Sequence, residues 1–135
     1  MNGRKKRERV MVIDDDAVAL ELASDWLSHA GYEVIARQSV LGSTAMILRE
    51  RPDLLLLDVH MPALNGSELA KLVTESSQDG KPGVIFHSAR NRSELQKLVR
   101  ERGALGAIEK GEDEASFVRQ FNRYAEDARK RRSRE

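Results

Sequence analysis

The chain has 135 residues, 40% of them apolar and 33% charged, which leaves room for one domain with an ordinary hydrophobic core. It contains no cysteine, which excludes disulfides and thiolate metal sites, and its six aromatic residues offer no platform for stacking single-stranded bases. The net charge of +1 conceals an asymmetry, because residues 1–9 and 129–135 each carry +4 and the stretch between them carries −7.

Strand and helix patterns alternate through the first half of the chain. Val10–Ile13 is a β-branched run that predicts a strand, and the helix after it has an apolar stripe at Val18, Leu22, Trp26 and Ala30. Tyr32–Ala36 alternates as a second strand. Leu41, Ala45 and Leu48 then mark a second helix, which we expect to end before Pro52.

The alternation continues in the second half. The run 53–58 is apolar on both faces and predicts a central strand, whereas Leu69, Leu72 and Val73 mark a third helix. Val84–His87 predicts a fourth strand, a helix capped by Ser93 is expected to end at Arg102, and Ala107–Glu109 predicts a fifth strand. The last helix has an apolar stripe at Phe117, Phe121, Tyr124 and Ala128.

Five strands alternating with five helices predict an α/β fold, a doubly wound parallel sheet in the order 2-1-3-4-5. In such sheets ligands bind beyond the carboxyl ends of the strands, so the chemistry is expected there. The side chains that follow the first, third, fourth and fifth strands are Asp14, Asp15, Asp16, Asp58, Ser88 and Lys110.

These residue types suit a metal ion and a phosphoryl group. Clustered carboxylates repel one another, and a hard divalent cation such as Mg²⁺ commonly holds them together. A lysine and a hydroxyl would supply a point charge and a hydrogen-bond donor to phosphoryl oxygens. Asp16 is interpreted as the cap of the first helix, and His87 as a packed strand residue.

Four segments of the sequence resemble the receiver domains of two-component response regulators, over about residues 9–128. Asp58 precedes Ser88 by 30 residues and Ser88 precedes Lys110 by 22, as in that family. The segments are Val10-Met-Val-Ile-Asp-Asp-Asp16, Pro52-Asp-Leu-Leu-Leu-Leu-Asp-Val-His-Met-Pro62 with Gly66, Val84-Ile-Phe-His-Ser-Ala89 and Gly103-Ala-Leu-Gly-Ala-Ile-Glu-Lys110. The resemblance implies the flavodoxin-like receiver fold.

The resemblance also implies a role for each matching residue. Asp58 would accept a phosphoryl group from a sensor histidine kinase, a phosphotransfer protein or a small phosphodonor, with Ser88 and Lys110 holding the phosphoryl oxygens. Such a chain is a phosphoacceptor rather than an enzyme acting on a separate substrate. The resemblance further implies that Mg²⁺ is bound by Asp15, by Asp14 mainly through water, by Asp58 and by the backbone carbonyl of His60.

Two positions depart from the family pattern. Ala107 stands where the family usually has an aromatic residue that moves on phosphorylation, and Gly111 stands where it usually has proline. These departures bear on whether phosphorylation reaches the face formed by the helix ending at Arg102, the strand 107–109 and the last helix. In the family, the side chains two positions after the phosphoacceptor and two after the hydroxyl residue flank the path of the hydrolytic water. The resemblance therefore implies that His60 and Arg90 tune the lifetime of the phosphorylated state.

Three functions stay open from the sequence. The first is a switch in which phosphorylation changes the binding of a downstream protein to that face. The second is a constitutive, receiver-like scaffold, and the third is a Mg²⁺-dependent phosphohydrolase, disfavoured because the chain lacks a substrate-cap insertion.

The chain is divided into a basic segment 1–8, a receiver domain 9–128 and a basic segment 129–135, whose charge would attract an anionic partner. The longest apolar run, Leu54–Leu57, is too short to span a bilayer, and no apolar signal segment follows the basic start, so we expect a cytoplasmic protein.

Overall fold

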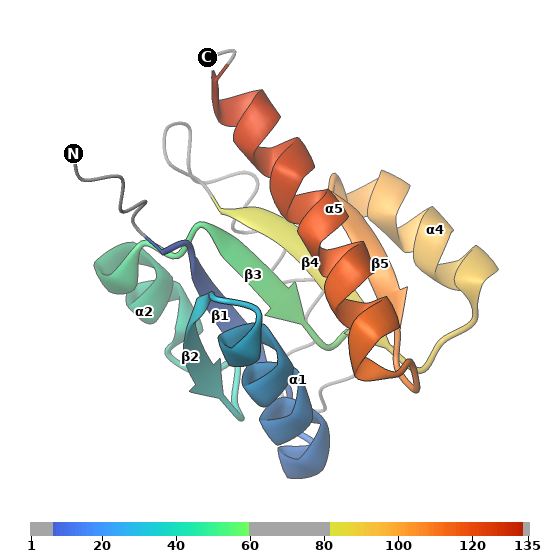
Figure 1. The fold of residues 1–135 in the computed structure, drawn as a ribbon, viewed down its shortest axis with the longest axis horizontal. Helices are drawn as coiled ribbons and strands as arrows, with labels where there is room; N and C mark the ends of the chain where they lie inside the picture. The colour runs from blue at the N-terminus through green and yellow to red at the C-terminus, as the bar shows by residue number, and fades with distance from the viewer. Residues whose placement is uncertain (1–6, 60–81, 134–135) are drawn as a thin grey trace.

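The computed structural model describes residues 7–59 and 82–133, which form a parallel sheet with helices on both faces (Figure 1). The five strands have the order β2-β1-β3-β4-β5, which confirms the predicted topology. In chain order the elements are β1 Arg9–Ile13, α1 Ala17–His29, β2 Glu33–Arg37, α2 Ser43–Glu50, β3 Leu54–Leu57, β4 Gly83–Ser88, α4 Arg92–Arg102, β5 Gly106–Glu109 and α5 Glu114–Ser133. The predicted third helix lies outside the described residues.

The hydrophobic core forms two layers, one on each face of the sheet. Val10 and Val12 of β1 face α1 and α5, whereas Met11 and Ile13 face α2 and α4. All four residues of β3 are buried, as expected for a central strand that is apolar on both faces. Because every strand is parallel, the residues that follow the strands collect at one edge of the sheet.

The predicted buried face of α1 was wrong in part, although Trp26 packs against the core as predicted. Leu20, Ala23 and Leu27 face the sheet, whereas Val18 is 67% exposed and Leu22 is 45% exposed. A helix turns every 3.6 residues, so a stripe spaced by four drifts around the helix instead of staying over the sheet.

The predicted buried face of α2 was wrong as well. Ser43 and Ile47 are buried there, whereas Leu41 and Leu48 are 66% and 69% exposed. Leu41 precedes the helix, so it could not mark its buried face.

Side chains cap the amino-terminal ends of α1 and α4. Asp16 caps α1, as predicted, and its carboxylate accepts from the backbone N–H of Val18 at 3.0 Å. The cap of α4 is Asn91 rather than Ser93, so that prediction was wrong. Asn91 accepts from the backbone N–H of Glu94 at 3.0 Å and donates to its carboxylate at 3.1 Å, which satisfies this helix end reciprocally.

Helix α5 continues to Ser133, so the basic segment that begins at residue 129 is largely helical. Arg129 and Arg132 both bind the carboxylate of Glu8, which lies just before β1. Glu8 and the basic end of α5 therefore lie together at the amino-terminal edge of the sheet (Figure 1).

Arg51, which follows α2, has a left-handed backbone with φ 49° and ψ 59°. We expect Arg51→Gly to raise the free energy of unfolding by about 0.5 kcal/mol, because the relief of strain slightly exceeds the entropy that glycine adds to the unfolded chain. Arg49→Gly, two residues earlier in the helix, is the matched control and should lower the same quantity by about 1 kcal/mol. Urea denaturation measures both, and equal losses would contradict the assignment of strain to Arg51.

Candidate functional site

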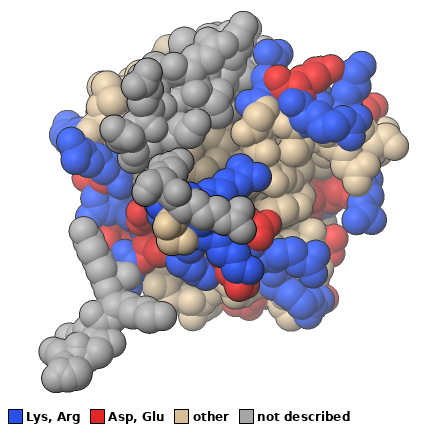
Figure 2. Space-filling view, turned by 90° about the horizontal axis from the view of Figure 1, so that it is seen from above, with Lys and Arg blue, Asp and Glu red and all other residues tan. Residues whose placement is uncertain are grey.

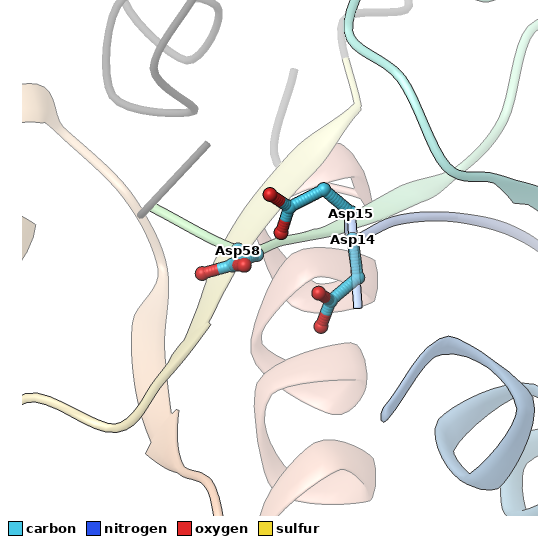
Figure 3. A group of neighbouring side chains, drawn as sticks. All are labelled: Asp14, Asp15 and Asp58. Atoms are coloured by element: carbon cyan, nitrogen blue, oxygen red, sulfur yellow. The ribbon is translucent and has the colours of Figure 1, made fainter. Parts of the chain in front are cut away.

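Three carboxylates meet at the carboxyl edge of the sheet, where β1 and β3 end (Figure 3). Asp14 and Asp58 are buried, at 2% and 4% exposure, whereas Asp15 is exposed. The parallel register pairs Ile13 with Leu57, and the backbone N–H of Asp58 donates to the carbonyl of Ile13 at 2.9 Å. Oxygens of all three carboxylates lie within 4.8 Å of one another. The sheet register therefore brings these predicted residues together.

Lys110, which follows β5, reaches into this cluster. Its Nζ lies 2.8 Å from Asp14 Oδ2 and 3.5 Å from Asp58 Oδ2. Burial works to lower the pKa of Lys110, but the hydrogen bonds and charges of Asp14 and Asp58 outweigh it, so that the pKa is raised from its ordinary value. The ammonium thus stays charged and offsets part of the negative charge of the two buried carboxylates.

Ser88 ends β4, the strand beside β3, and is fully buried. Its hydroxyl oxygen accepts from the backbone N–H of Arg90 at 3.1 Å, and its carbonyl accepts from the backbone N–H of Lys110 at 2.8 Å. These bonds fix the ends of β4 and β5 relative to each other. Ser88 and Lys110 consequently lie at the same edge as the carboxylates, where the sequence predicted them.

His87 packs inside the domain, with its ring centroid 5.2 Å from that of Phe117. Burial lowers the pKa of His87 to about 4, and the charge of Lys110 acts in the same direction against the weaker, opposite effect of Asp14. The sequence predicted that His87 is packed, but it did not indicate that the charges of Lys110 and Asp14 act on the pKa of His87. The imidazole is therefore neutral at pH 7.

Because His87 is neutral in the folded protein, we expect the free energy of unfolding to fall in acid. The unfolded chain takes up a proton below about pH 6.5, whereas the folded chain takes it up only near pH 4, so protons favour unfolding between these values. By pH 5 the expected loss from His87 is about 2 kcal/mol. His87→Phe keeps an aromatic packing partner for Phe117 and should remove that loss. Urea denaturation at pH 8 and pH 5 measures it, and equal pH dependence in both proteins would contradict this prediction.

The positions predicted to transmit or tune the signal are only partly described. Ala107 of β5 is half-buried, and its carbonyl accepts from the hydroxyl of Tyr124 at 3.2 Å. Gly111 has φ 101°, which a proline could not adopt. Arg90 lies beside the site through its backbone bond to Ser88, whereas His60 is outside the described residues, so its predicted carbonyl ligand has no described geometry.

The donor set fits a hard divalent cation. Asp14, Asp15 and Asp58 supply only carboxylate oxygens, which suit Mg²⁺ better than a soft metal. The exposure of Asp15 leaves a side of the cluster open to water, and Mg²⁺ commonly keeps several water ligands. These three residues could therefore hold the ion.

Comparison with known proteins agrees with this geometry. The family model of the response regulator receiver domain matches residues 10–122. The putative two-component response regulator ARR21 of Arabidopsis thaliana is 38% identical over 103 residues, which are 75% of this chain but only 16% of that protein. The polar-differentiation response regulator DivK of Brucella anthropi is 26% identical over 119 residues, covering 88% of this chain and 97% of DivK.

A solved structure shows the same fold. The CheY-like response regulator receiver domain protein from Methanospirillum hungatei JF-1 superposes with a TM-score of 0.81 at 21% identity, covering 93% of this chain and 99% of that one. None of the described helices has the length and apolar character needed to cross a membrane. The match to the family over most of the sequence, together with the shared sheet topology, shows that this chain belongs to the receiver domains of two-component response regulators.

Proposed function

We propose that Asp58 accepts a phosphoryl group in a Mg²⁺-dependent reaction and that its phosphorylation changes the binding of a partner protein. The observation that carries this proposal is the position of the Lys110 ammonium, 2.8 Å from Asp14 and 3.5 Å from Asp58, beside a carboxylate cluster open to solvent at Asp15. A buried carboxylate next to a fixed cation is suited to receive a group whose negative charge must be neutralised.

The phosphoryl group would come from a phosphohistidine of a sensor kinase or phosphotransfer protein, or from a small phosphodonor. A carboxylate oxygen of Asp58 attacks phosphorus and the bond from phosphorus to the donor breaks. In phosphohistidine the donor nitrogen keeps the electron pair and the imidazole takes up a proton, whereas acetyl phosphate releases the acetate anion. Lys110 stabilises the charge of the transferred group, and the Ser88 hydroxyl is available to donate to its oxygens. Bound Mg²⁺ would supply further charge neutralisation at Asp14, Asp15 and Asp58. The chain is thus proposed to be a phosphoacceptor, not an enzyme with a separate substrate.

The partner is proposed to bind the face formed by α4, β5 and α5. A groove of about 620 Å³ lies there, lined by Arg92, Gln96 and Arg100 of α4, Ala107 of β5 and Tyr124 of α5. β5 leads directly into Lys110, so a shift of that lysine toward a phosphoryl group would act on this face.

A constitutive scaffold is the second candidate, and Tyr124 is the observation that favours it. Its ring fills the space beside Gly106, where an added Cβ would lie 2.1 Å from Tyr124 Cε1, and its hydroxyl is bonded to the Ala107 carbonyl. This bonded tyrosine would hold β5 in one position whether or not Asp58 is phosphorylated.

Incubation with Mg²⁺ and acetyl phosphate tests the proposal. We expect a mass increase of one phosphoryl group, lost in EDTA, and changed amide hydrogen exchange in β5 and α4. Phosphorylation without any change in exchange would favour the scaffold, and no phosphorylation would refute the phosphoacceptor role. Sustained release of phosphate from varied phosphomonoesters would instead indicate a phosphohydrolase.

A further inference from the structure

A second charged site lies at the opposite edge of the sheet from the carboxylates. A cleft of about 370 Å³ opens there, beside the amino ends of β1 and β3, and four arginines line it: Arg7, Arg9, Arg49 and Arg51. Glu8 also lines this cleft and binds Arg129 and Arg132, so the basic residues 129–132 at the end of α5 lie beside it. We call the four cleft arginines and residues 129–132 the basic pole. Figure 2 views this end of the molecule, where Lys and Arg side chains gather across the surface.

Pairing within the basic pole leaves several cations available. Arg9 forms ion pairs with Glu33 at 3.4 Å and Glu50 at 3.9 Å, so its charge is offset by carboxylates of the same domain. Arg7, Arg49 and Arg51 are exposed and form no ion pair with a carboxylate in the part of the chain that the structure describes. Five carboxylates line the cleft or pair with cations of the basic pole: Glu8, Glu33, Glu50, Asp53 and Glu126. With them counted, the basic pole carries a net charge of +3, although residues 10–128 together carry −7.

Arg51 adds an observation independent of charge. Its left-handed backbone would suit glycine better, yet a long cationic side chain occupies this position at the cleft. Backbone strain that is retained at a surface residue indicates that its side chain has a function, such as binding a ligand.

The shape and chemistry of the basic pole define its partner. Seven of its eight cations are arginines, whose planar guanidinium groups match phosphate in a bidentate way. Helices α2 and α5 pack on opposite faces of the sheet, so the basic pole extends over about 20 Å, which fits an elongated polyanion better than one small phosphate. A concave cleft accepts a protruding strand of phosphates, whereas a flat lipid surface cannot enter it. None of the described residues that line the cleft is aromatic, so they offer no stacking for unpaired bases.

We propose that the basic pole binds the phosphate backbone of duplex nucleic acid, independently of base sequence and of the phosphorylation site. β1, only 5 residues long, separates the cleft from Asp14 by about 16 Å. A duplex bound at the basic pole would therefore leave the carboxylate cluster accessible.

The test is fluorescence anisotropy with a labelled duplex of about 20 base pairs, long enough to cover the basic pole, titrated with the full chain at several salt concentrations. We expect affinity to fall steeply with salt and to be equal for two unrelated sequences. Arg49→Ala with Arg51→Gly should weaken binding about tenfold at low salt and reduce the slope of log Kd against log salt by about 2. Alanine suits the helix at 49 and glycine suits the backbone at 51, so this variant should stay folded.

Lys97→Ala with Arg119→Ala is the matched control. It removes the same charge from exposed positions on α4 and in the first half of α5 that do not line the cleft, and should change affinity less than about twofold. Asp58→Asn should bind the duplex like the wild-type chain, which separates this proposal from the phosphoacceptor role.

Equal losses in the two double variants would overturn the proposal, because only overall charge would then matter. Tighter binding to phosphatidylglycerol vesicles, to a polyglutamate peptide or to a single strand of equal length would also overturn it, and so would no binding to the duplex at low salt.

Discussion

Asp58→Asn is expected to abolish phosphorylation by acetyl phosphate while leaving the domain folded. The substitution removes the proposed nucleophile, and the amide that replaces it cannot form an acyl phosphate. Lys110 keeps its 2.8 Å contact with Asp14, and one charge leaves a crowded carboxylate cluster, so the free energy of unfolding at pH 7 should not fall. Intact-mass spectrometry and urea denaturation measure the two outcomes.

Asp16→Asn is the control for that experiment. It removes a carboxylate next to the cluster, and asparagine caps a helix about as well as aspartate, so this variant should be phosphorylated like the wild-type chain. Undiminished phosphate uptake in Asp58→Asn would place the acceptor on another residue.

Asp15→Ala is expected to weaken Mg²⁺ binding by more than about tenfold, because a hard cation loses an anionic oxygen ligand. The side chain is exposed, so its removal should not disturb the fold. Isothermal titration with Mg²⁺ measures the affinity. Phosphorylation at a limiting Mg²⁺ concentration should fall in parallel, and saturating Mg²⁺ should restore part of it.

Lys110→Ala is expected to impair phosphorylation without weakening Mg²⁺ binding. Lys110 competes with a cation for Asp14 Oδ2, so its removal should leave Mg²⁺ affinity at least as high while phosphorylation declines. Unchanged Mg²⁺ binding in Asp15→Ala would refute the metal assignment at that residue.

The site could be predicted from the sequence because a parallel sheet has strict geometry. Once Val10–Ile13, the run 53–58 and Val84–His87 are assigned as strands, the residues after them must meet at one edge. The structure places Asp14, Asp58 and Ser88 at that edge.

Helix faces and side-chain contacts were harder to predict. Val18 and Leu22 look like core residues in the sequence, but the fixed connections to β1 and β2 turn Leu20 and Leu27 toward the sheet instead. The closer contact of Lys110 with Asp14 than with Asp58 also depends on side-chain positions that no spacing encodes.

The two arginine contacts of Glu8 make the described chain nearly circular. Residues 8 and 132 are 124 positions apart in sequence, yet their side chains lie 3.1 Å apart. A short linker could therefore join this end of α5 to the residues before β1, and new termini could be opened at the turn after α4, where Gly103 has open space around it. Such a circular permutant would retain all four strand pairings while its chain ends lay beside β5 instead of β1.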